Sequence, residues 1–154
     1  VAAETQDGSI FVKQKAELGV PTKVFGVGSW ATADFIKLTG ASSEGIYAAV
    51  PYASTMTTPK NKAFVDAYTA RYKEAPGKYS AAGYNAINIL VDAIGRAGST
   101  DPEKIRDALS KTKYEGPNGH FEFDEKGQAS GFTVVLVQLQ KGVPVIAAST
   151  IVER

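Results

Sequence analysis

Residues Phe25–Ala31, FGVGSWA, have the spacing G-x-G-x-x-A, one form of the dinucleotide-binding fingerprint, and they follow a strand-like run, TKVF. In that fold an acidic residue at the end of the next strand holds the ribose. Glu44 lies at about the right distance but precedes the next strand-like run, and Trp30 would crowd a pyrophosphate. A tight turn without a ligand is a second interpretation. We favour a third, a strand-end loop that holds a small solute, with the Ser29 hydroxyl and the Trp30 ring as its contacts.

A second polar stretch, near the N-terminus, also directly follows an expected strand. The residues after VAA are Glu4, Thr5, Gln6 and Asp7, which we expect on one loop. Parallel strands align their carboxyl ends, so this loop and FGVGSW should lie on the same edge of the sheet. A solvated loop without a ligand is the alternative.

The run KYSAAGYNAI opens the longest helical pattern and is a third candidate. Tyr79 begins the helix, and the small residues Ser80 and Ala81 leave room for a ligand to approach its N–H groups and its positive dipole end. A carboxylate would suit that position. The alternative is that aromatic residues at helical spacing, such as Tyr79 and Tyr84, belong to the core.

Catalytic patterns do not emerge from the sequence. It contains one histidine, His120, no cysteine and no G-x-S-x-G elbow, so neither a nucleophile with its base nor a histidine zinc site is expected. We expect His120 to be exposed or in a turn. The sequence therefore predicts no enzyme, no metal and no cofactor.

The elements that must position these residues follow from periodicity. Residues 8–18 and 33–38 have helical patterns, and 23–26 and 45–50 have strand patterns. With a strand end before them, they read β-α-β-α-β, an α/β fold with a parallel sheet and covering helices. Further helices are expected from Thr58 (N-cap) and Pro59 (N1), over 79–97, and from the N-cap Asp101 to Leu109. Strands are expected at 132–140 and 143–149, joined at Lys141-Gly142.

Bulk composition is that of a globular domain with a core. The chain has 154 residues, is 44% hydrophobic and 21% charged, and carries a net charge of +1. Nucleic-acid binding through bulk charge is therefore not expected. The longest apolar runs, such as 132–139, are far shorter than the roughly 20 residues of a membrane span.

The order of several motifs resembles one family. The chain supplies F-x-x-x-Y-x-x-x-Y, P-x-x-Y-x-A-x-x-Y, A-G-S and G-x-x-x-F-D-x-x-G in succession, and these begin at Phe64, Pro76, Ala97 and Gly119. Together with KQKAELG and GASSEGIYAAVPY they resemble the C-terminal half of type I periplasmic solute-binding proteins. The most similar branch is the leucine/isoleucine/valine-binding family of ABC importers.

The resemblance implies an extracytoplasmic, bilobed protein that closes on a solute and presents it to the membrane permease of an ABC transporter. Residues 1–75 would complete the second lobe, 76–130 would belong to the first lobe, and 131–154 would form strands crossing the hinge. The chain opens without an initiator Met, so we expect a fragment of a longer protein. Apolar surface exposed in such a fragment predicts a homodimer or segment exchange.

The family's ligand contacts fall around Glu4–Gln6, Gly28–Trp30 and Ala81. The resemblance implies a branched-chain or other hydrophobic amino acid as the solute. Amino-acid binders usually place an acidic residue near position 28, and Gly28 departs from that pattern. An aromatic or branched carboxylate without an amino group is therefore an alternative solute, and a ligand-sensing receptor ectodomain is an alternative class.

Overall fold

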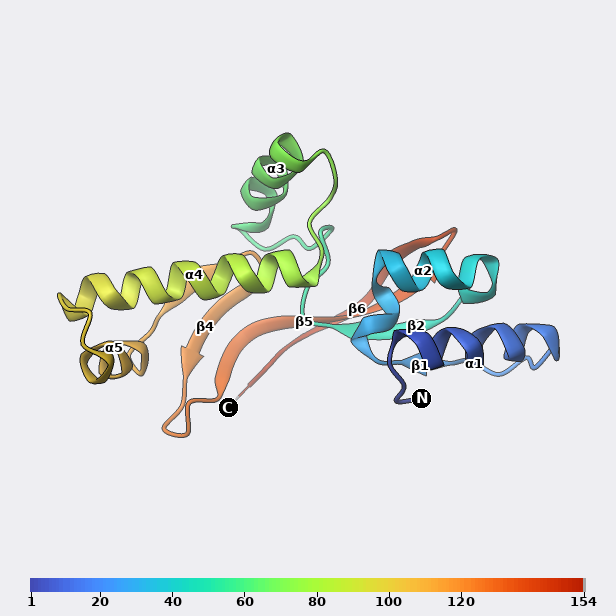
Figure 1. Ribbon diagram of the computed structural model, residues 1–154, viewed down its shortest axis with the longest axis horizontal. Helices are drawn as coiled ribbons and strands as arrows, with labels where there is room; N and C mark the ends of the chain where they lie inside the picture. The colour runs from blue at the N-terminus through green and yellow to red at the C-terminus, as the bar shows by residue number, and fades with distance from the viewer. Residues whose placement is uncertain (154) are drawn as a thin grey trace. The chain divides into compact units, whose positions relative to one another are not determined.

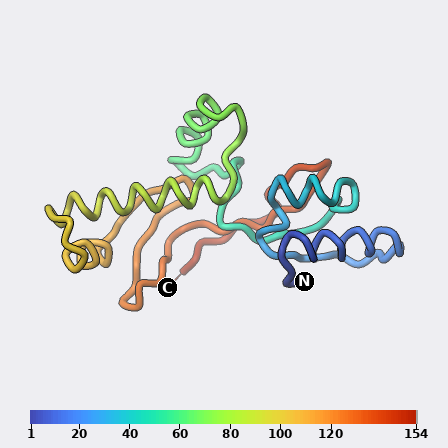
Figure 2. Tube along the Cα trace, in the orientation of Figure 1, coloured from blue at the N-terminus to red at the C-terminus, as the bar shows by residue number. Residues whose placement is uncertain are grey.

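A computed structural model describes residues 1–153, and the chain divides into two compact units. Unit 1 comprises residues 1–55 and 134–149, and unit 2 comprises residues 56–133 with the chain from 150 onward (Figure 1). Figure 2 traces the chain from the first unit into the second and back again. Each unit is thus assembled from segments that are distant in the sequence.

Unit 1 has helices over two strands and a hairpin. Its elements in chain order are α1 (Thr5–Glu17), β1 (Phe25–Gly26), the 3-10 helix η1 (Gly28–Ala31), α2 (Ala33–Thr39), the 3-10 helix η2 (Gly40–Ser43) and β2 (Tyr47–Val50). β1 pairs in parallel with β2, and β2 pairs antiparallel with β5 (Ala129–Gln140), with Val50 opposite Val135. β5 also pairs with β6 (Val143–Ile151).

The core of unit 1 lies between its helices and its strands. Helices α1 and α2 contact each other (Figure 1). The side chains with no exposed surface in this unit are Val12, Trp30, Phe35, Ala48, Val137 and Leu139. Burying aromatic and branched side chains of this size stabilises a fold by roughly 1.5–3 kcal/mol each.

Unit 2 combines three helices with a small antiparallel sheet. Its helices are α3 (Asn61–Tyr72), α4 (Lys78–Ala97) and α5 (Pro102–Leu109), and its strands are β3 (Tyr114–Gly116), β4 (Gly119–Phe123) and the start of β5. β3 pairs with β4, and β4 pairs with β5 with a register shift between Gly119 and Glu122. Helix α5 packs beside the end of α4, where Arg96 Nη1 donates to the Ala108 carbonyl oxygen at 2.6 Å.

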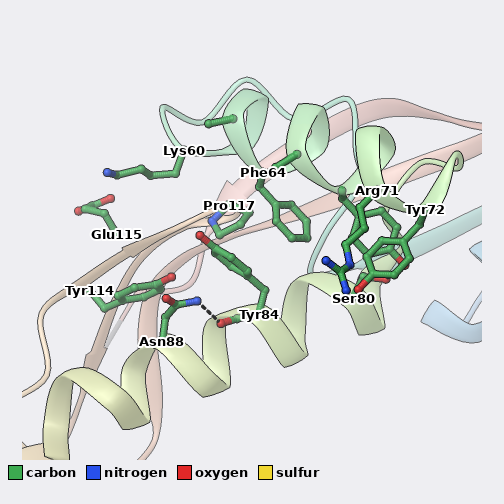
Figure 3. A pocket seen from close by; sticks show the side chains of 13 residues that line it. Lys60, Phe64, Arg71, Tyr72, Ser80, Tyr84, Asn88, Tyr114, Glu115 and Pro117 are labelled. Atoms are coloured by element: carbon green, nitrogen blue, oxygen red, sulfur yellow. Dashed lines mark hydrogen bonds between the residues drawn. The ribbon is translucent and has the colours of Figure 1, made fainter.

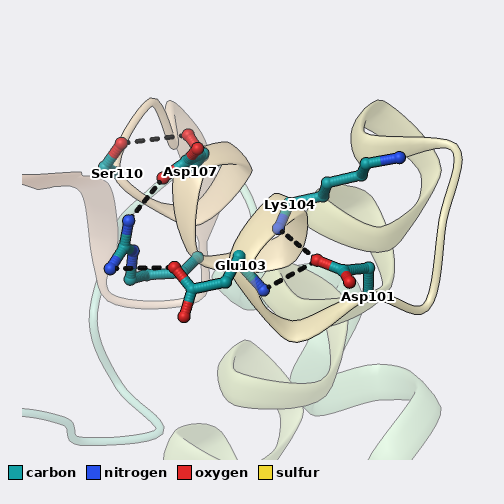
Figure 4. Close-up of polar contacts among 6 residues, drawn as sticks. Asp101, Glu103, Lys104, Asp107 and Ser110 are labelled. Atoms are coloured by element: carbon teal, nitrogen blue, oxygen red, sulfur yellow. Dashed lines mark hydrogen bonds and ion pairs between the residues drawn. The ribbon is translucent and has the colours of Figure 1, made fainter.

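The predicted α/β class is confirmed, and several element ends are where local signals placed them. Thr32 caps α2 by accepting from Phe35 N–H, and Asp101 caps α5 by accepting from Glu103 and Lys104 N–H (Figure 4). Lys141 and Gly142 both have positive φ, 52° and 76°, which suits a two-residue hairpin turn.

Three details differ from the sequence prediction. Parallel pairing is confined to β1 with β2, and the other strand pairs with a described register are antiparallel. Helix α1 begins at Thr5, so the polar stretch at 4–7 is its N-cap and first turn instead of a loop. Helix α3 begins at Asn61 with Lys60 as its N-cap, and the Thr58 hydroxyl instead donates to the Pro117 carbonyl oxygen.

Helix α4 buries one face and leaves apolar side chains uncovered. Ala81, Asn85, Ile89 and Ala93 are buried, whereas Ile87 and Val91 are each 62% exposed. Within residues 1–153, no helix combines the length and apolar character needed to cross a membrane.

Candidate functional site

The two polar segments predicted to share one edge lie in contact within unit 1. Trp30 Nε1 in η1 donates a hydrogen bond to the Ala3 carbonyl oxygen, 2.7 Å away. A Cβ built on Gly8, in the first turns of α1, would lie 2.4 Å from the same nitrogen. The structure therefore brings η1 and the start of α1 into contact, although residues 1–4 before α1 do not form the strand that the sequence analysis expected.

The start of α1 offers backbone donors at this edge. Glu4 is the N-cap and is exposed, and its side chain forms no capping bond within the described chain. Thr5 is half-buried and Gln6 is exposed. The first N–H groups of a helix lack intrahelical partners and lie at its positive end, so this turn can receive an anionic group.

The η1 residues differ in what they can offer a ligand. Gly28 is half-buried and has no side chain. Ser29 is 8% exposed, and its Oγ has no hydrogen-bond partner among residues 1–153. A buried hydroxyl without a partner costs roughly 1–3 kcal/mol, which a ligand donor or acceptor would offset.

Trp30 does not form the exposed apolar wall that the sequence suggested. The side chain has no exposed surface, and its ring stacks on Phe35 with centroids 5.0 Å apart and planes inclined by 12°. The physical reason is that burial removes the largest apolar ring of the chain from water, while Ala3 satisfies its N–H. Its place in this structure is the core of unit 1.

The candidates at the start of α4 lie in unit 2 and are unequally accessible. Tyr79 is 73% exposed, and Lys78 Nζ lies 4.7 Å from its ring centroid. Ala81 is 1% exposed. Ser80 Oγ donates to the Tyr68 hydroxyl at 3.0 Å. The Tyr79 ring is therefore accessible from solvent, whereas Ala81 packs inside the unit.

Sequence reasoning missed a cavity of about 670 Å³ in unit 2 (Figure 3). Its lining includes Phe64, Tyr68, Tyr72, Tyr84, Tyr114 and Arg71. The Phe64 and Tyr84 ring centroids are 4.8 Å apart. Burial, and secondarily the nearby Tyr84, raise the pKa of Tyr114. The aromatic stripe of α3 was visible in the sequence, but the cavity needs α3, α4 and β3 together.

The sequence analysis expected His120 to be exposed or in a turn, and the structure places it in strand β4. Two carboxylates flank its imidazole ring. Its Nδ1 is 2.6 Å from Glu115 Oε1, and its Nε2 is 3.0 Å from Glu122 Oε1. Hydrogen bonds to Glu122 and to Glu115 raise the pKa of His120, since both carboxylates favour the protonated ring. The arrangement is that of a cross-strand ion-pair cluster.

Comparison with known proteins assigns the family. The sequence model of the periplasmic binding protein family matches residues 1–143, so the chain belongs to that family. A leucine-, isoleucine-, valine-, threonine- and alanine-binding protein of Pseudomonas aeruginosa is 30% identical over 132 residues, which are 86% of this chain and 35% of that protein. The Leu/Ile/Val-binding protein of Escherichia coli is 27% identical over 121 residues, 79% of this chain and 32% of that protein.

A solved structure supports the type I periplasmic binding fold. The leucine-binding protein of Thermotoga maritima superposes with a TM-score of 0.89 at 29% identity, covering 96% of this chain and 43% of that one. The chain thus spans about a third of the length of the curated relatives it matches. Its placement in their C-terminal half stays a prediction.

Proposed function

We propose that this chain is part of the extracytoplasmic solute-binding component of an ABC importer, which holds a branched-chain or other hydrophobic amino acid between two lobes. The observation that carries the proposal is the contact between η1 and the start of α1, made by Trp30 and Ala3, in a chain of this family. The proposal is supported by two relatives, the leucine-, isoleucine-, valine-, threonine- and alanine-binding protein of Pseudomonas aeruginosa and the leucine-binding protein of Thermotoga maritima.

The chemistry of the proposed site is recognition without transformation. The first N–H groups of α1 would receive a negatively charged or carbonyl group, and the Ser29 hydroxyl would form one further hydrogen bond. The exposed Tyr79 ring would cover apolar atoms of the solute. Glu4, Thr5, Gln6 and Gly28 remain proposed contacts, whereas Trp30 and Ala81, whose side chains are buried, would support the site without exposing their side chains to the solute.

The proposal extends to the organisation of the longer protein. Residues 1–75 would complete the second lobe, 76–130 would lie in the first lobe, and 131–154 would cross the hinge. The partner would be a membrane permease that receives the solute on lobe closure. The exposed side chains of α4, including Ile87 and Val91, support dimerisation of this chain when it stands alone.

A specific observation favours a second solute class. Gly28 has no side chain to hold an ammonium group, which leaves the exposed carboxylates of Glu4 and Asp7, at the start of α1, as the candidates to accept it. If neither Glu4 nor Asp7 accepts the ammonium group, an aromatic or branched carboxylate without an amino group is the better solute.

A matched pair of ligands tests both classes. Leucine and 4-methylpentanoate differ only in the amino group, and benzoate adds an aromatic carboxylate. A ligand at ~1,000 times its Kd stabilises the folded state by about 4 kcal/mol, which a thermal shift of the intact protein would detect. Selective stabilisation by leucine supports the amino-acid proposal, selective stabilisation by either carboxylate supports the alternative, and no stabilisation by any of them contradicts both.

Glu4→Gln sharpens the same experiment. If Glu4 holds the ammonium group, the substitution weakens leucine binding and leaves 4-methylpentanoate binding unchanged. Glu17→Gln, at the far end of the same helix, is the control and should change neither.

A further inference from the structure

Trp30 contacts three separate segments of unit 1 with a side chain that no solvent reaches. Its indole N–H bonds the Ala3 carbonyl oxygen at 2.7 Å, and its ring stacks on Phe35 of α2. We propose that Trp30 is a positioning residue, which fixes η1 against the start of α1 so that Ser29 and the first-turn N–H groups keep one geometry. The inference rests on the proposed solute-binding function of this edge.

Two glycines mark the space that the indole occupies. A Cβ on Gly8 would lie 2.4 Å from Nε1, and a Cβ on Gly26 would lie 2.1 Å from Cε3. Neither glycine has a positive φ, so backbone conformation does not require glycine at either position. The requirement is steric, because the ring lies against the backbones of α1 and β1.

The neighbouring Ser29 shows what this anchoring achieves. Its hydroxyl is buried and finds no partner in the described part of the chain, which is a costly state. A loop free to move would relax until the hydroxyl met water or a protein acceptor. We attribute its retention to Trp30, whose hydrogen bond and close packing hold the loop in place.

The test separates the indole hydrogen bond from the packing of the ring. Trp30→Phe removes the N–H and keeps an aromatic ring, and 3-benzothienylalanine at position 30 keeps the full ring volume and removes only the N–H. Phe35→Leu is the matched control, because it disturbs the same stacked pair and leaves the bond to Ala3 intact. Each change is made in the intact protein.

Two measurements are compared, and one of them needs no ligand. Loss of the bond to Ala3 should raise amide hydrogen exchange at 4–8 and 28–32 in the free protein more than Phe35→Leu does. It should also weaken leucine binding about three- to tenfold, as expected for one hydrogen bond, while Phe35→Leu changes affinity less than twofold despite lowering the melting temperature.

The outcomes distinguish this inference from the proposed function. Unchanged exchange at these amides in the benzothienylalanine protein would overturn the positioning role, and so would faster exchange with unaltered affinity. If the parent protein binds neither leucine nor 4-methylpentanoate nor benzoate, the proposed function fails. Faster exchange in that case still supports the mechanical link between Trp30 and Ala3, and unchanged exchange refutes it.

Discussion

Glu44 and Lys141 are joined across 97 residues of sequence, with Glu44 Oε2 accepting the Lys141 backbone N–H at 2.7 Å. The next residue, Gly45, donates its N–H to the Leu139 carbonyl oxygen at 2.8 Å. The acid that a dinucleotide fold would use for the ribose is thus engaged with the turn between β5 and β6. The Glu44 carboxylate therefore links the loop before β2 to the β5–β6 turn.

Replacing Glu44 by Ala should destabilise unit 1 by about 1 kcal/mol, because a charge-assisted bond to a turn N–H is lost and the site is exposed enough for water to replace it in part. Chemical denaturation measures the change. Glu74→Ala is the control, since Glu74 is exposed and has no hydrogen bond or ion pair in the described structure. Equal effects of the two substitutions would contradict the role of the bond.

Gly8→Ala and Gly26→Ala should each destabilise the protein by about 3 kcal/mol or more, because the new methyl group overlaps the Trp30 ring. Gly83→Ala is the contrasting variant. It lies in the interior of α4, where an added Cβ meets no atom of the described chain within 4 Å, so helix propensity should stabilise it by about 0.5–1 kcal/mol. Unfolding midpoints that rank the three variants otherwise would contradict this packing.

Asp101→Ala should cost about 1 kcal/mol of stability, because the N–H groups of Glu103 and Lys104 lose their acceptor. Asp101→Asn keeps a capping oxygen and should be close to neutral. Urea denaturation of the two variants gives the comparison, and an Asn variant as unstable as the Ala variant would show that charge matters more than the cap.

His120 should make stability depend on pH in a defined direction. Its pKa is raised above the ordinary value of 6.5 by Glu122 and Glu115, so folding favours the protonated ring. This stabilisation is fully present below about pH 6.5 and is lost as the pH rises through the raised pKa. The cluster is partly exposed, so solvent screens it, and the effect should be below about 1 kcal/mol and weaken in high salt.

The measurement for His120 is the free energy of unfolding between pH 6 and pH 9. His120→Gln should remove this part of the pH dependence, and Glu122→Gln should reduce it. If the His120→Gln protein keeps the same pH dependence of its unfolding free energy, that dependence comes from other groups.

Tyr79→Ala should weaken solute binding by the intact protein about tenfold or more, because the proposed site assigns its exposed ring a contact with apolar atoms of the solute. The residue is 73% exposed, so its loss should change the melting temperature little. Calorimetric titration with leucine, or with the carboxylate that the thermal-shift panel selects, measures the affinity. Unchanged affinity would remove Tyr79 from the proposed site.

Elements whose ends depend on neighbouring residues could be predicted from the sequence. Thr32 and Asp101 cap their helices, Gly98 ends α4 with a φ of 57°, and Lys141-Gly142 turns the final hairpin. These signals act within about four residues. Thr58 shows the limit of that reasoning, since its hydroxyl donates to the Pro117 carbonyl oxygen 59 residues away and the helix begins at Asn61 instead of Pro59.

By itself the sequence determined the α/β class, the family through the order of its motifs, and the two segments that meet at the edge of unit 1. Only the tertiary structure decided what each side chain there does. Trp30 turns into the core because Gly8 and Gly26 leave room for an indole and Ala3 offers an acceptor. Gly26 and Phe35 lie close to Trp30 in sequence, but the Ala3 acceptor and Gly8 come from the N-terminal segment more than 20 residues away, so the local pattern around Trp30 does not contain them.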